Sequence, residues 1–242
     1  MAVSLRRPIA FALVLICALA APAVACLWDS DTLWQERAAF PSALELITGK
    51  FLRHSPEFYA WRVQDRLEKL KADPNNLALR DDLAVAYQKT GRSAEAIAVL
   101  EEKERIQPGV YETYSNLGTV YILQGDFEKG LPYIDKALAI NPDAHFGREK
   151  YQKWLVEYAL SRMTDGKLTF PLREFKTYNE SRYPANEGFY DFLKVKWSES
   201  GDDRGDLSGA VKGVLGMMRF ADHQNPLLLE ALGDLLFPGE EN

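Results

Sequence analysis

The fold of this chain is decided by residues 77–108, which read LALRDDLAVAYQKTGRSAEAIAVLEEKERIQP, and by residues 111–142, which read YETYSNLGTVYILQGDFEKGLPYIDKALAINP. The two segments read as copies of one unit, because Pro74, Pro108 and Pro142 stand at equal intervals of 34 residues. Small and large side chains recur in step between these prolines. A period of 34 residues predicts successive helix-turn-helix units.

The matched positions have a physical reason. Two antiparallel helices approach to about 8 Å only where their side chains are small, and small residues face each other in both copies. Gly91 and Gly125 follow the first helix of each copy, where a left-handed residue ends a helix at low cost. The closing proline stops the second helix. The residues expected to pack between the helices are Leu83, Ala84, Tyr87, Ala96, Leu117, Gly118, Tyr121 and Gly130.

This pattern resembles the tetratricopeptide (TPR) repeat, with its Leu-small pair, its Tyr three residues on, its small residue in the second helix and its closing Pro. The first copy departs from the family at Arg80 and Lys103, where an aromatic residue and Ala are usual, and we expect both on an outer turn. The resemblance implies an all-α, TPR-like α-solenoid of antiparallel helix pairs, with atypical capping helices and one irregular insertion. It also implies a role in binding other proteins.

Residues 1–25 have the three parts of a signal peptide: Arg6 and Arg7, an apolar run, and the small-residue cleavage site Ala23-Val24-Ala25. Cys26 follows directly, and the junction resembles a bacterial lipoprotein signal, which implies lipidation at Cys26. The alternative is plain cleavage that leaves a free thiol. The sequence therefore predicts an exported protein, either a periplasmic or outer-membrane lipoprotein or a secreted one, whose contact with a membrane is limited to a possible N-terminal lipid anchor.

Composition excludes several classes of function. The chain has 29 basic and 35 acidic residues, a formal net charge of −6, which argues against nucleic acid as a partner because that ligand requires a basic face. The three histidines lie in separate segments, and no serine-nucleophile or phosphate-loop motif occurs. We predict no catalytic residue, no metal site and no cofactor.

Five segments follow from these patterns: the signal peptide at 1–25, an N-terminal apolar segment with short helices at 26–54, the repeat core at 55–163, an irregular segment at 164–206 and a C-terminal helical pair at 207–242. In the core, a helix from Ser55 to about Ala72 is expected to bury Phe58, Trp61, Val63, Leu67 and Leu70 as half of a degenerate repeat. Residues 207–220 and 226–237 are the expected helices of the last pair.

The resemblance places a partner-binding groove on the first helix of each copy. Its positions here are Asp81, Val85, Gln88, Lys89, Glu112, Ser115, Thr119, Ile122 and Leu123. The main hypothesis is a non-enzymatic interaction or scaffold protein of the bacterial cell envelope that binds a peptide or protein in this groove. A first alternative is a structural lipoprotein that aids assembly of an envelope complex. A second is an enzyme with its site in 164–206, using Glu180, Arg182 or Tyr183. Residues 164–206 could also fill the groove.

Overall fold

The computed structural model describes residues 27–31, 40–143, 147–173, 188–202 and 204–237. Within these ranges the regular secondary structure is helical, apart from an isolated bridge between Thr164 and Lys167, which confirms the prediction of an all-α, TPR-like solenoid. In chain order the helices are α2 (Ala43–Ile47), α3 (Pro56–Ala72), α4 (Leu77–Lys89), α5 (Ser93–Ile106), α6 (Tyr111–Leu123), α7 (Phe127–Ile140), α8 (Arg148–Ser161), α9 (Phe189–Glu199), α10 (Leu207–Phe220) and α11 (Pro226–Leu236).

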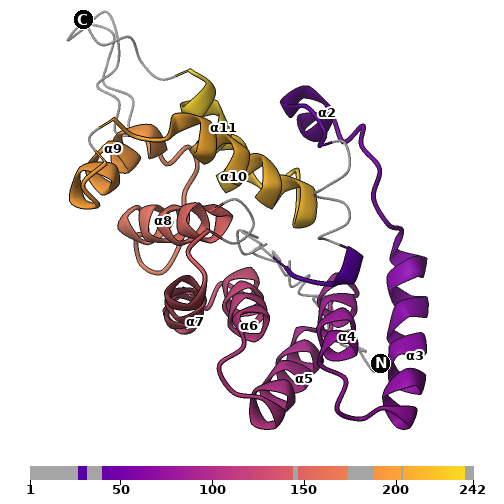
Figure 1. Ribbon diagram of the computed structural model, residues 1–242. Coiled ribbons are helices and arrows are strands. Elements are labelled where there is room, and N and C mark those ends of the chain that lie inside the picture. The colour runs from indigo at the N-terminus through magenta and orange to yellow at the C-terminus, as the bar shows by residue number, and fades with distance from the viewer. Residues whose placement is uncertain (1–26, 32–39, 144–146, 174–187, 203, 238–242) are drawn as a thin grey trace, which may run out of the picture.

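Helices α3 to α8 form the solenoid, in which each helix packs against the next in the chain (Figure 1). The turns between them are built as the sequence suggests. Asn76 and Asp126 cap α4 and α7 by accepting hydrogen bonds from the backbone N–H groups of Leu79 and Lys129. Gly91 and Gly125 take positive φ angles of 76° and 81° just after α4 and α6.

The predicted packing residues lie where the repeat requires them. Of the eight, seven are buried, and the eighth, Tyr121, is half-buried with its ring stacked on that of Tyr133 at 5.8 Å between centroids. Helices α6 and α7 approach each other closely. A Cβ atom added to Gly130 would lie 2.9 Å from the carbonyl oxygen of Gly118 and 3.2 Å from the backbone nitrogen of Ile122. Backbone atoms cannot move aside as a flexible side chain can, so only glycine fits there.

We therefore expect Gly130→Ala to lower the free energy of unfolding by about 1 to 3 kcal/mol, because the new methyl group overpacks the α6–α7 interface. Gly233→Ala is the matched control. Gly233 is exposed within α11, and a Cβ atom there meets nothing within 4 Å. That change should raise stability by roughly 0.5 to 1 kcal/mol through helix propensity. Urea denaturation measures both, and equal effects of the two substitutions would disprove the close helix contact.

The prediction of which side chains α3 buries is wrong in part. Val63 of α3 is buried, but Trp61 and Leu67 are 55% and 37% exposed. Arg62, at 0% exposure, points inward in their place. The apolar pattern misled because α3 is the first helix of the stack and, within the solenoid, packs mainly on α4. A terminal helix has one covered face, and here an arginine occupies part of it.

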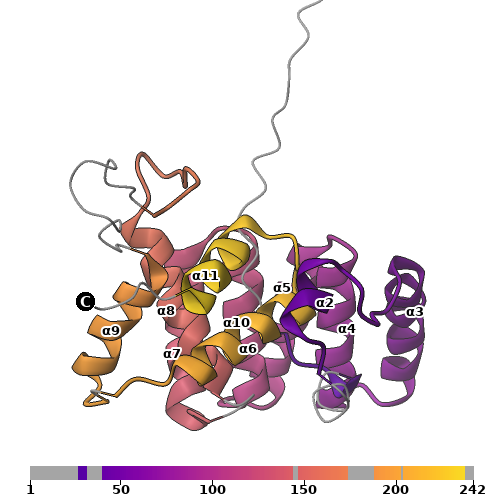
Figure 2. The same cartoon turned by 90° about the horizontal axis from the view of Figure 1, so that it is seen from above.

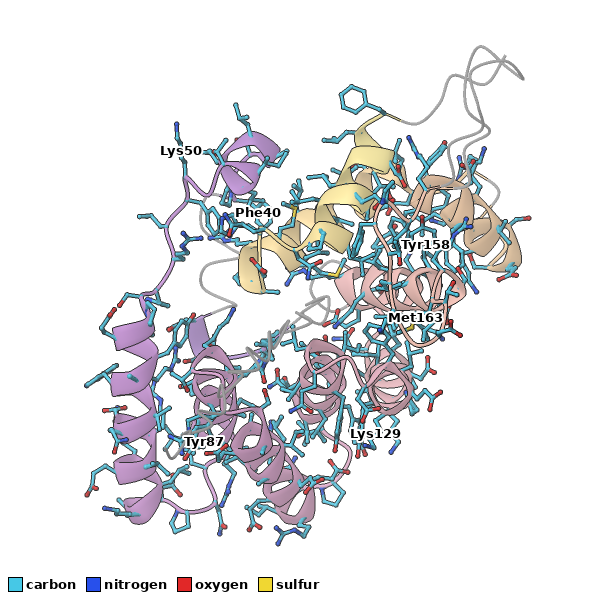
Figure 3. The ribbon with its side chains drawn as sticks, turned by 180° about the vertical axis from the view of Figure 1, so that it is seen from behind. Phe40, Lys50, Tyr87, Lys129, Tyr158 and Met163 are labelled. Atoms are coloured by element: carbon cyan, nitrogen blue, oxygen red, sulfur yellow. The ribbon has the colours of Figure 1, made fainter. Side chains whose placement is uncertain are left out.

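The C-terminal helices close the open side of the arc formed by α3 to α8 (Figures 1 and 2). Helix α10 packs on α8 and contacts α2, and α11 packs on α10 and α9. The bounds of α10 and α11 agree with the predicted helical pair to within a residue. A single large apolar cluster joins α8 to α11, and Phe40 packs against it beside the guanidinium of Arg219 (Figure 3).

The segment 164–206 is only partly irregular. It contains α9, whose Phe189, Leu193 and Trp197 are buried in the C-terminal core. Glu180, Arg182 and Tyr183 lie outside the described residues. Across the described ranges, none of the helices combines the length and the apolar content that a membrane crossing requires.

Candidate functional site

The chain itself covers much of the predicted groove. Five of its nine residues are buried, and the other four are half-buried. Ser115 and Thr119 face α8. The Ser115 hydroxyl donates a hydrogen bond to the carboxylate of Glu149 at 3.3 Å, and the Thr119 hydroxyl oxygen accepts one from the side-chain amide of Gln152 at 3.1 Å. The buried residues are Asp81, Val85, Ser115, Thr119 and Ile122, and the half-buried ones are Gln88, Lys89, Glu112 and Leu123.

Residues 27–31 lie along the concave face of α4 and α6. The backbone N–H of Trp28 donates to Oδ1 of Asn116 at 2.6 Å, and Nδ2 of Asn116 donates back to the Trp28 carbonyl at 3.0 Å. The Trp28 ring meets Tyr111 edge-on at 6.3 Å between centroids, and the Leu27 side chain is buried at 2% exposure. Residues far from the 164–206 segment therefore occupy this part of the groove.

An ion cluster holds this N-terminal segment to the first helix pair. The Arg62 guanidinium lies 2.5 Å from Asp31, 3.4 Å from Asp29 and 3.1 Å from Asp82. Asp82 also accepts hydrogen bonds from the backbone N–H and the hydroxyl of Ser30, both at 2.9 Å. Burial by itself would raise the pKa of Asp82, but the Ser30 N–H and Arg62 outweigh it and hold that pKa below its usual value. The segment is thus tied down by charge as well as by packing.

A second charged pair lies deeper. Lys103 of α5 donates to Asp81 of α4 at 2.5 Å, and Asn116 also contacts the Asp81 carboxylate at 3.3 Å. Lys103 is 1% exposed, so the expectation that it lies on an outer turn is wrong. Burial raises the pKa of Asp81 to about 7 against the opposing effect of Lys103. The departure of Lys103 from the TPR pattern is explained by its partner: an acidic residue at 81 matches it.

The part of the concave side that stays open is a pocket of about 420 Å³. Four distant segments line it: residues 27–31, residues 51–59, the C-terminal end of α4, and the end of α10 with the turn after it. Lys89 lies in its wall and donates a hydrogen bond to the carbonyl oxygen of Phe220. Of the predicted groove residues, Val85 and Lys89 line this pocket.

The pocket also brings together polar residues that no pattern in the sequence would group. His54 lies 3.3 Å from Asp31, and its ring stacks on Phe58 at 3.8 Å between centroids. Arg53 donates to Nδ1 of His223 at 3.2 Å, although the two are 170 positions apart. No local motif could have revealed this, because the fold alone brings the ends of α10 and α4 together. Within the described ranges, no three His, Cys, Asp or Glu residues are placed to hold a metal ion.

Comparison with known proteins bears on the repeat. A family model of the tetratricopeptide repeat matches residues 111–144. Residues 111–144 are a tetratricopeptide repeat. This TPR repeat comprises α6 and α7, a pair in close backbone contact, and it is the copy whose sequence fits the family better. TPR repeats are in general motifs of protein–protein interaction, and the match indicates a module of that kind.

Two curated relatives share a part of the chain. The ER membrane protein complex subunit 2 of Xenopus tropicalis and subunit 2-B of Xenopus laevis are each 30% identical to it over 92 residues. The matched part is 38% of this chain and 30% of each relative, so the chain spans about a third of their length. No solved structure matches the chain. The similarity thus concerns a stretch of 92 residues shared with a subunit of a membrane protein complex.

Proposed function

We propose that this chain is a non-enzymatic scaffold subunit of a bacterial cell envelope, which helps to assemble a membrane-associated protein complex. The observation that carries the proposal is the self-filled concave face. Five of nine groove positions are buried, and residues 27–31 bond to α4 and α6 where a peptide would lie. A partner is therefore held by outer helix surfaces, as in the first alternative from the sequence, rather than by the groove of the main hypothesis.

Exposed apolar side chains on the N-terminal side favour one surface for this contact. Within the eleven residues 42–52, Leu44 is 70% exposed, Ile47 43% and Leu52 95%. Helix α2 buries only Leu46, by which it packs into the C-terminal core. Neighbouring exposed aliphatic residues of this kind are typical of a protein contact. We name Leu44, Ile47 and Leu52 the α2 patch.

Anchoring at Cys26 completes the proposal. The signal peptide at 1–25 and the lipoprotein-like junction support export and lipid attachment. Acyl chains would fix the scaffold to a membrane face, and the periplasmic side of the outer membrane is the proposed location. The relatives named above, each a subunit of a membrane protein complex by title, are in keeping with a role beside a membrane.

The test combines crosslinking in the source cells with purification of the mature protein. The wild type is expected to bring down one partner reproducibly, and Leu44→Asp with Leu52→Asp should lower its recovery by about tenfold, because both carboxylates would have to be desolvated at the interface. Val195→Asp is the matched control, since Val195 is 57% exposed on α9, away from the α2 patch (Figure 1). Equal loss with both variants would refute the patch, and no specific partner would refute the scaffold. Mass spectrometry of the mature N-terminus checks the acyl chains on Cys26.

A further inference from the structure

The pocket on the concave side has the size of a ligand site. Its volume of about 420 Å³ falls within the roughly 300 to 1,000 Å³ of small-molecule pockets. Its apolar walls include Leu27, Val85 and Met218, each at most 3% exposed, and the rings of Phe51 and Phe220. Such walls would take up the apolar body of a ligand.

The acidic and the basic residues of the pocket differ in whether they have ion-pair partners. Asp29 and Asp31 are both paired with the buried Arg62 behind them. Lys89 donates to a neutral carbonyl, that of Phe220, and Arg53 contacts neutral groups, the His223 ring nitrogen and the face of Phe51. Among the described residues, no carboxylate lies within hydrogen-bonding distance of Lys89 or Arg53. The pocket therefore presents two cations whose charge has no direct partner.

The environment of Lys89 agrees with this imbalance. Burial lowers the pKa of Lys89 to about 8, and the more distant charges of Asp29 and Asp222 offset the effect only in part. An anion at the ammonium group would remove much of this cost, because opposite charges in a partly desolvated site attract strongly.

We propose that this pocket binds a small organic carboxylate, with the carboxylate on Lys89 and close to Arg53 and an apolar ring or short chain against Val85 and Met218. A free acid fits better than the end of a long peptide, because residues 27–31 already occupy the adjoining concave face. This binding site shares only Leu52 with the α2 patch, and it goes beyond the scaffold function.

Calorimetry on the full mature chain tests the proposal with matched probes. Phenylacetate and octanoate are compared with the neutral phenylacetamide and octanamide, and the dipeptide Leu-Phe with its C-terminal amide. Each acid should bind about tenfold or more tightly than its amide, since a hydrogen bond between charged groups is stronger than one to a neutral amide. Equal binding of acids and amides, or no binding at millimolar concentration, would overturn the proposal. Tighter binding of Leu-Phe than of both free acids would overturn the assignment to a free acid.

Variants locate the ligand. Lys89→Met should weaken binding of the acids by about tenfold or more and leave the amides unchanged, while Arg53→Gln should have a smaller effect in the same direction. Lys71→Met is the control, because Lys71 is exposed and pairs with Glu68 outside the pocket. Since Lys89→Met also frees the Phe220 carbonyl, Ala221→Phe provides a second approach, in which the added ring fills the pocket without a change of charge. Undiminished binding by Ala221→Phe in a folded protein would place the ligand elsewhere.

Discussion

Lys103→Met is expected to lower the free energy of unfolding by about 3 to 5 kcal/mol at neutral pH. The change removes the ammonium group 2.5 Å from Asp81 and leaves a carboxylate with little access to water. Breaking a buried ion pair from one side costs about this much, because the remaining charge is desolvated without compensation. Lys71→Met, at an exposed pair, should change stability by less than about 1 kcal/mol.

The second repeat indicates which second substitution should restore the stability lost in Lys103→Met. In the second repeat, Ser115 stands at the position of Asp81 and Ala137 at the position of Lys103, and both are buried. We expect Asp81→Ser combined with Lys103→Met to recover most of the loss, because replacement of both charges removes the unpaired carboxylate. Chemical denaturation of the four proteins measures this as a double-mutant cycle. If the double variant is no more stable than Lys103→Met, the pair does not determine stability.

The deficit of Lys103→Met should also depend on pH. The pKa of Asp81 is already raised from its ordinary value of 3.8 to about 7 with Lys103 in place, and loss of the ammonium group raises it further. The folded carboxyl of the variant then binds its proton more tightly than the unfolded one. The free energy of unfolding of the variant therefore falls as the pH rises from the unfolded pKa of Asp81 to its folded pKa. Because the two folded states differ in protonation only above about pH 7, the deficit relative to the wild type should grow as the pH is raised from about 7 to about 9 and change little below about 7.

Arg62→Leu is the second change from which we expect a loss of about 3 to 5 kcal/mol. It removes the cation that lies between Asp29, Asp31 and Asp82, of which Asp29 and Asp82 are at most 4% exposed. The N-terminal segment should then detach from α3 and α4, so limited proteolysis near residues 27–31 should become faster. The control is Arg105→Leu, since Arg105 is exposed and pairs with Glu102 of the same helix.

Arg62→Lys separates charge from shape. A lysine keeps the positive charge but cannot form the planar, forked set of hydrogen bonds that guanidinium makes with several carboxylates. It should restore part of the stability lost in Arg62→Leu and little of the protection from protease. Full restoration of both would mean that charge alone holds the segment, and no difference between Arg62→Leu and Arg105→Leu would refute the cluster.

The sequence predicted well what depends on local pattern. Helix ends followed from the glycines and prolines of the repeat, and α10 and α11 from apolar spacing, since these features act within a few residues of each other. It failed at Arg62 and Lys103, which a pattern of polarity places outside. Their burial depends on Asp82 and Asp81, which lie on other helices, and such pairing across helices leaves no local trace. The pocket could not be predicted for the same reason, because Arg53 and His223 come into contact only when the C-terminal layer folds back.

The burial of Leu27 has a consequence for motion. Leu27 follows Cys26 directly, so under the proposed lipid attachment the anchor would lie one peptide unit, about 3.8 Å in Cα spacing, from a side chain fixed in the solenoid. Such a molecule would have no flexible linker between its lipid anchor and its folded domain. It would lie close against the lipid in a narrow range of tilts, and its partners would meet it at a nearly constant height above the bilayer.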